Sequence, residues 1–120
     1  MLTEEFIPIT ADNVLEFLHQ RYGQDCERVH GERRHQPRWP FPGTVELWIP
    51  NDQGDEDYVL AHALNVSTLG IGIMSDEQIA PNTQVSLAIH QPEATLFGRA
   101  TVRHVTDTVD GAVIGLRFHY

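Results

Sequence analysis

The chain has 120 residues, 41% of them hydrophobic, which is enough for the core of one small domain but not of two. Eight basic residues, all arginine, against 17 acidic residues give a net charge of −9. This balance disfavours duplex DNA and other long polyanions as partners, although a local arginine cluster can still bind a small anion.

The sequence indicates a cytoplasmic protein without a membrane partner. Its single cysteine, Cys26, cannot form an internal disulfide. Neither a secretory leader nor an apolar run of membrane-spanning length is present. The thiol carries no nucleophile signature, so we expect a buried or incidental cysteine.

The first elements are a short arm and one helix. Residues 1–10 are expected to be extended, because their proline precludes a helix. Residues 12–22 carry apolar side chains at helical spacing, which predicts a helix. Thr10 or Asp12 can cap its start, and Gly23 can end it. Because so short a helix is marginal unless packed, we expect it to cover an open end or face of the following sheet. Docking onto another protein is the alternative.

Residues 23–43 are polar and contain three prolines, which predicts a largely irregular linker. The linker carries three clustered arginines: Arg33, Arg34 and Arg38. A proline directly before the last of them disfavours helix, so the guanidinium groups should project from an extended or turning segment. There they can bind a phosphate or the edge of a guanine. Alternatively, they form a solvated turn paired with Glu27 and Glu32.

Beyond Gly43 the apolar residues recur with period two, which predicts β-strands. We expect six strands, at residues 44–49, 58–65, 71–74, 84–90, 95–106 and 112–119. Short connections without crossover helices imply an antiparallel sheet, which at this length should close into a small barrel. The predicted class is therefore all-β, with one N-terminal helix.

Asn65, Ser67 and Gly70 form the second informative stretch, between the second and third predicted strands. Side chains two apart on a strand share a face, so the amide and the hydroxyl could read a guanine together. The glycine permits a tight turn. The alternative is a turn in which Asn65 and Ser67 bond their own backbone.

Catalysis and metal binding have little support. Seven histidines are scattered without the helical spacing of a zinc hydrolase, and no serine lies in a nucleophile elbow. The acidic loop at residues 50–57 lacks the closing glutamate of a calcium loop. We expect no catalytic residue, no metal and no cofactor.

Two motifs together resemble the signature of the PilZ domain family. R-x-x-x-R spans residues 34–38, and N-x-S-x-x-G follows at residues 65–70, after 26 intervening residues. Residues 114–118, I-G-L-R-F, are similar to the last strand of the family. The resemblance covers about residues 32–120, so the expected organisation is an N-terminal arm and helix at 1–31 and a barrel domain at 32–120. It implies a six-stranded antiparallel barrel that binds the bacterial messenger cyclic di-GMP.

The resemblance also implies roles for individual residues. Arg34 and Arg38 would clamp phosphate and guanine, with Arg33 as a third contact that favours two stacked nucleotides. Asn65 and Ser67 would read a guanine, and Gly70 would hold the turn. The family accepts Asp or Asn at position 65, and with Asn the charge-assisted bond to the base is absent, so affinity could be modest.

Three functions are compatible with these features. The first is a cyclic di-GMP receptor that signals to a protein partner of unknown identity through a conformational change. The second is a PilZ-like adaptor that does not bind nucleotide, which the additional helix and acidic surface would suit. A single-stranded RNA binder is disfavoured by the net charge and by strands nearly free of arginine.

Overall fold

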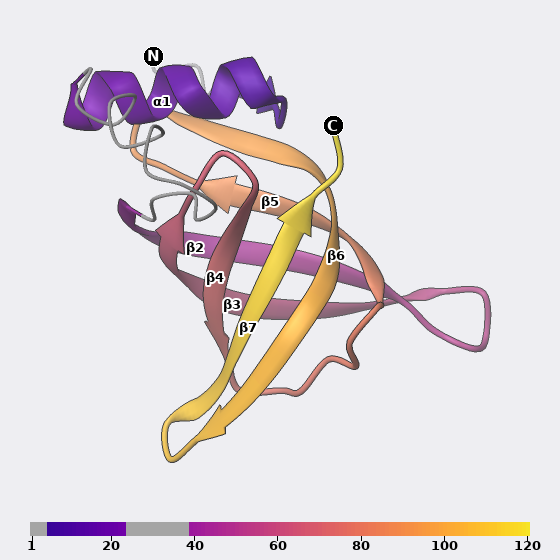
Figure 1. Cartoon of the computed structure of the whole chain (residues 1–120). Coiled ribbons are helices and arrows are strands. Elements are labelled where there is room, and N and C mark those ends of the chain that lie inside the picture. The colour runs from indigo at the N-terminus through magenta and orange to yellow at the C-terminus, as the bar shows by residue number, and fades with distance from the viewer. Residues whose placement is uncertain (1–4, 24–38) are drawn as a thin grey trace.

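One helix and seven strands make up the computed structural model, which describes residues 5–23 and 39–120 (Figure 1). In chain order they are β1 (Glu5–Pro8), α1 (Ala11–Tyr22), β2 (Trp39–Pro50), β3 (Glu56–Val66), β4 (Gly70–Ser75), β5 (Gln84–His90), β6 (Ala94–Thr108) and β7 (Gly111–Phe118). No helix in these two ranges is long and apolar enough to cross a membrane.

Six of the strands, β2 to β7, form a closed antiparallel barrel, which confirms the predicted fold class. The sheet order is β1-β6-β5-β2-β3-β4-β7, and a further pairing between β6 and β7 closes the ring. Closure depends on β6, whose 15 residues pair with β5 up to Thr101 and with β7 from Ala100 onward. Every barrel strand therefore has two neighbours, which removes the exposed edges of an open sheet.

The N-terminal arm adds a strand that the sequence did not predict. β1 is extended, as expected, but it pairs in parallel with the start of β6, from Glu5 opposite Ala94 to Pro8 opposite Phe97. Ile9 continues this contact by donating its N–H to the Phe97 carbonyl at 2.7 Å. Pro8 fits here because β1 lies at the edge of the sheet, where one side of the strand needs no ladder bond.

The core is one cluster shared by the barrel and the helix. Alternate residues of the strands point inward, and Val45, Leu47 and Ile114 are completely buried. Val14 and Leu18 of α1 belong to the same cluster. In Figure 1, α1 lies across one end of the barrel. The expected intramolecular cover is therefore confirmed.

Local chemistry at both ends of α1 follows the sequence. The Thr10 hydroxyl accepts a hydrogen bond from the Asn13 amide at 3.1 Å, which identifies Thr10 rather than Asp12 as the N-cap. Gly23 ends the helix at φ +75°, where a glycine avoids steric strain, and donates its N–H to the His19 carbonyl.

The predicted extent of the linker was wrong at its C-terminal end. β2 begins at Trp39, five residues before the predicted start, and includes Pro40 and Pro42. These prolines are tolerated because the pairing of β2 with β5 starts only at Val45 and the pairing with β3 shifts register between Pro40 and Gly43. A residue in this stretch need not donate a backbone hydrogen bond to strands on both sides, so a proline, which has no N–H, can stand there.

The acidic hairpin loop between β2 and β3 is organised by hydrogen bonds to the Asn51 side chain. The Asn51 side chain accepts hydrogen bonds from the amides of Gln53 and Asp55, at 3.0 and 3.1 Å. Within the described ranges, no group of three or more histidine, cysteine, aspartate or glutamate side chains is arranged to hold a metal ion. Cys26 lies outside those ranges.

Candidate functional site

The N-x-S-x-x-G stretch forms the turn between β3 and β4. Ser67 is 3% exposed, and its backbone N–H donates to the Gly70 carbonyl at 2.9 Å. Its hydroxyl oxygen accepts from the amides of Leu69 and Gly70, at 3.1 and 3.3 Å. These bonds agree with the alternative interpretation of the sequence for Ser67, in which its side chain bonds the backbone of the turn. The hydroxyl proton can still be donated in a hydrogen bond to an acceptor atom of a ligand.

Asn65 and Ser67 are held by different local structure. β3 ends at Val66, so the strand geometry that would place both side chains on one face does not extend to Ser67. Asn65 is half-buried within the strand, opposite Pro40 of β2 and Gly72 of β4. A Cβ on Gly72 would lie only 2.8 Å from the Asn65 Oδ1 atom, so this glycine leaves the space that the amide occupies. The sequence reading did not single out Gly72.

Gly70 is required by a close approach between strands. A Cβ at this position would lie 2.0 Å from the carbonyl oxygen of Leu116 on β7. The glycine therefore permits β4 to pair with β7 directly beside the turn. Together with its two bonds to Ser67, this contact fixes the position of the turn on the barrel.

Phe118 and Tyr120 also support this turn, a role that no sequence pattern predicted. The Phe118 amide donates to the Leu69 carbonyl at 2.8 Å, and the Tyr120 hydroxyl donates to the Thr68 carbonyl. Partial desolvation raises the pKa of Tyr120, whose surface is 58% exposed, to about 12. The turn is thus bonded from within by Ser67 and from outside by the end of β7.

The three predicted ligand arginines, Arg33, Arg34 and Arg38, lie outside the described residues. Tyr22 and Trp39, which lie on either side of this segment in the sequence, are described and contact each other. The rings of Tyr22 and Trp39 lie 5.0 Å apart between centroids, and the Tyr22 hydroxyl donates to the Pro40 carbonyl. Trp39 is opposite Val66, and Pro40 is opposite Asn65. The chain therefore enters the barrel directly beside the β3–β4 turn.

Arg21 ties the same end of α1 to the barrel. Its guanidinium donates to the Gln91 and Glu93 side chains, with 3.0 Å to the Glu93 carboxylate, and lies 4.9 Å from the centroid of the Phe41 ring. Gln91 in turn donates to the Pro42 carbonyl at 3.1 Å. The last turn of α1 thus contacts the first residues of β2 through several polar and aromatic groups.

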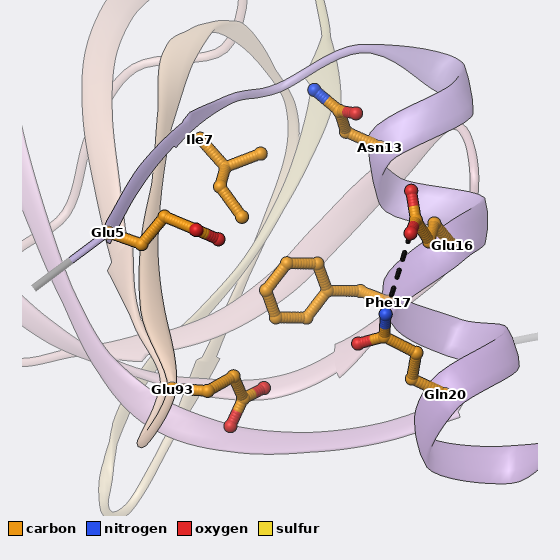
Figure 2. A pocket seen from close by; sticks show the side chains of 7 residues that line it. All are labelled: Glu5, Ile7, Asn13, Glu16, Phe17, Gln20 and Glu93. Atoms are coloured by element: carbon orange, nitrogen blue, oxygen red, sulfur yellow. Dashed lines mark hydrogen bonds between the residues drawn. The ribbon is translucent and has the colours of Figure 1, made fainter.

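A cavity of about 380 Å³ between α1 and β1 is unsuited to an anion (Figure 2). Ile7 and the Phe17 ring supply its apolar part. Carboxylates of Glu5, Glu16 and Glu93 surround it, and like charge repels a phosphate. This cavity is therefore a poor candidate for the anionic ligand that the sequence predicts.

A family model described as PilZ domain matches residues 32–120. No curated protein gives a significant match.

Two solved structures are similar in fold. The Bacillus subtilis inhibitor of motility, MotI/DgrA, has 20% sequence identity and a TM-score of 0.58, and the match covers 74% of this chain and 44% of that one. The PilZ domain with c-di-GMP of YcgR from Escherichia coli has 10% identity and a TM-score of 0.58, over 72% of this chain and 78% of that one. This chain thus matches less than half of the length of the Bacillus protein.

Proposed function

Because the chain belongs to the PilZ domain family, we propose that it is a cytoplasmic receptor for the bacterial second messenger cyclic di-GMP and not an enzyme. In this proposal Arg34 and Arg38 clamp phosphate and guanine, and Arg33 adds a third contact. Asn65 and Ser67 contact a guanine edge, and Gly70 positions the turn that carries them.

The observation that carries the proposal is the position of Trp39 directly beside the β3–β4 turn. Trp39 directly follows Arg38 in the sequence and is paired with Val66, the residue between Asn65 and Ser67. The described residue next to the arginine motif is therefore paired with the strand end that carries the second motif, which supports the proposal. A dianionic ligand suits an arginine-bearing segment here, since charge-assisted hydrogen bonds contribute about 1.5–3 kcal/mol each.

We further propose that binding is passed on to a protein partner through α1. Tyr22 contacts Trp39 and Pro40, which places the last turn of the helix next to the proposed site. A ligand that changes the position of Trp39 would change these contacts too.

A nucleotide-independent adaptor is the second candidate. It is favoured by the Ser67 hydroxyl, whose oxygen is already bonded to two backbone amides without a ligand. It is also favoured by exposed apolar side chains on the barrel, among them Leu60 and Phe97 at 54% and 43% exposure.

Calorimetric titration of the purified chain with cyclic di-GMP separates these candidates. The receptor proposal predicts saturable binding, and titrations with GTP and with a short single-stranded RNA should give none. Saturable binding of the RNA alone, or no binding of any of the three, would contradict the receptor proposal.

Replacement of Arg38 tests the assigned clamp. Arg38→Ala removes a guanidinium contact to the ligand, so the affinity should fall about tenfold to a hundredfold while the melting temperature stays nearly unchanged. Arg103→Ala, an exposed arginine on β6 to which we give no role, is the matched control. Equal affinity of Arg38→Ala and the parent would show that the role given to Arg38 is wrong.

A further inference from the structure

The indole N–H of Trp39 is a buried hydrogen-bond donor that has no partner in the part of the chain that the structure describes. Its nitrogen is almost completely covered by protein atoms, although the residue as a whole is only half-buried. The great majority of buried donors in native structures are paired, because an unpaired one loses its bond to water without replacement. This N–H is therefore a feature that the contacts of the free chain do not explain.

The Trp39 ring has a packing role that does not need the N–H. It lies 5.0 Å from the Tyr22 ring between centroids, at an interplanar angle of 30°, and packs against the apolar core. A phenylalanine could make both contacts without placing a polar group in the interior. Trp48, the other tryptophan of the chain, contacts the Tyr58 ring and has no such buried, unpaired nitrogen. The Trp39 N–H thus indicates a partner that the free chain does not supply.

Trp39 lies at the end of the barrel that carries the proposed ligand site. It is paired with Val66, the residue between Asn65 and Ser67, and its neighbour Pro40 is paired with Asn65. The Ser67 oxygen accepts two hydrogen bonds from backbone amides, which leaves the hydroxyl proton to be donated. An indole nitrogen can only donate. Two donors from separate segments of the chain therefore lie at the same end of the barrel.

We propose that Trp39 is a ligand-binding residue, whose indole N–H donates to an acceptor atom of cyclic di-GMP in the complex. This inference rests on the proposed function and adds to it a residue outside both parts of the family signature. The phosphate oxygens of the nucleotide and the O6 and N7 atoms of its guanines are all acceptors. An unpaired N–H at this position is matched to any of them.

Binding of the ligand by Trp39 requires the indole to move, because its nitrogen is covered in the free protein. The residue is half-buried, so a rotation about its side-chain torsions can bring the N–H to the surface. The same rotation changes the contact with Tyr22, the last residue of α1. The free arrangement leaves the donor unpaired and the bound arrangement pairs it, so the ligand interacts differently with the two arrangements and favours the second.

Trp39→benzothienylalanine tests the N–H without changing the shape of the ring, because a sulfur atom takes the place of the N–H group. Calorimetric titration of this variant with cyclic di-GMP should show an affinity about tenfold lower than that of the parent, the effect of one lost hydrogen bond. Trp39→Phe should lose at least as much. Trp48→benzothienylalanine is the matched control and should bind as the parent does. Circular dichroism checks that each variant is folded.

The indole signals in a proton–nitrogen correlation spectrum give a readout that a purely structural role of Trp39 would not change. The chain has two tryptophans, so the spectrum has two indole N–H signals, which the two benzothienylalanine variants assign. Saturating cyclic di-GMP should move the Trp39 signal downfield, the direction expected for a proton that gains an acceptor. The Trp48 signal should stay in place.

The outcomes separate this inference from the proposed function. Binding by the parent with an unmoved Trp39 signal would overturn the role given to Trp39 and leave the receptor proposal standing. Equal affinity of Trp39→benzothienylalanine and the parent would do the same. A parent that shows no calorimetric binding of cyclic di-GMP would overturn the receptor proposal and this inference with it.

Discussion

The hydroxyl of Ser67 has a structural task that precedes any ligand. Its oxygen accepts from the amides of Leu69 and Gly70, and the side chain is almost fully buried. A serine in this position can therefore shape the turn with its oxygen and offer its proton to a bound base. These two tasks can be separated by experiment, since only the first contributes to the stability of the free protein.

Ser67→Ala should destabilise the free chain. It leaves the Gly70 amide, which is buried, without its acceptor, and such a loss costs about 1–3 kcal/mol. Urea unfolding measures the change in the free energy of unfolding. Ser86→Ala, at a partly exposed serine on the outer face of β5, is the control and should change it by less than about 0.5 kcal/mol. Equal stability of Ser67→Ala and the parent would contradict the structural task.

Tyr120 should make stability depend on pH in the alkaline range. Partial desolvation raises its pKa from 10.0 to about 12, so the folded state binds the phenolic proton more tightly than the unfolded chain does. The resulting stabilisation is complete below about pH 10 and is lost as pH rises to about 12. In urea unfolding at several pH values, Tyr120→Phe should lose less stability over this interval than the parent. A decline as steep as that of the parent would contradict this.

The site was only partly predictable at this scale. The spacing of Asn65, Ser67 and Gly70 marked the turn, because a polar pair and a glycine after an apolar run favour one. The supporting contacts of Leu116 and Tyr120 could not be foreseen, since they come from residues about fifty positions later that only barrel closure brings near. The local sequence predicts the hydrogen bonds within the turn, but it does not predict which residues from distant parts of the chain contact the turn.

α1 is joined to the barrel by both apolar and polar contacts. Phe17 and Leu18 are buried in the shared core, and Tyr22 and Arg21 bond to β2 and the β5–β6 turn. A helix of 12 residues is marginal by itself, so its order depends on these contacts. Any ligand that changes the first residues of β2 acts on the same contacts.

Cyclic di-GMP should therefore alter amide exchange at the end of α1. Saturating ligand should slow the exchange of the amides in residues 19–23 several-fold, since Tyr22 is bonded to the strand start beside Asn65. Hydrogen exchange read by NMR measures this. The hairpin loop at residues 51–55, at the other end of the β2–β3 ladder, is the internal control and should not change. Unaltered exchange at 19–23 despite binding would contradict a route through α1.

Strand and helix positions followed from periodicity, and the failures have physical causes. The predicted strand at residues 84–90 coincides with β5, and the predicted helix differs from α1 by one residue. The start of β2 was missed because two prolines usually exclude a strand, and here they occupy a stretch without a second ladder. β1 was missed as a strand because four residues show no useful period.

At the scale of the whole molecule, strand pairing brings Trp39, the residue that follows the R-x-x-x-R motif, to the turn that carries the second motif. The pairing of β4 with β7 and of β2 with β3 fixes Gly70 and Trp39 around the same turn. The ligand proposed for this end would therefore contact segments from different parts of the chain, and binding should stabilise the fold as a unit.

Thermal unfolding with and without cyclic di-GMP tests this linkage. A ligand that binds only the folded chain at one site stabilises it by about 2.7 kcal/mol at one hundred times its dissociation constant. For a chain of 120 residues this corresponds to a rise in melting temperature of roughly 10 °C. Two stacked nucleotides would give a larger rise.

The adaptor alternative predicts a different outcome for the same measurement, because a chain that does not bind the ligand unfolds at an unchanged temperature. GTP at the same concentration is the ligand control and should leave the melting temperature where it was. Arg38→Ala is the protein control: at the same ligand concentration the stabilisation should fall from about 2.7 to about 1.4 kcal/mol for a tenfold loss of affinity and to about 0.4 kcal/mol for a hundredfold loss, with a correspondingly smaller rise in melting temperature. An equal shift in both proteins would place the ligand elsewhere than at the arginine clamp.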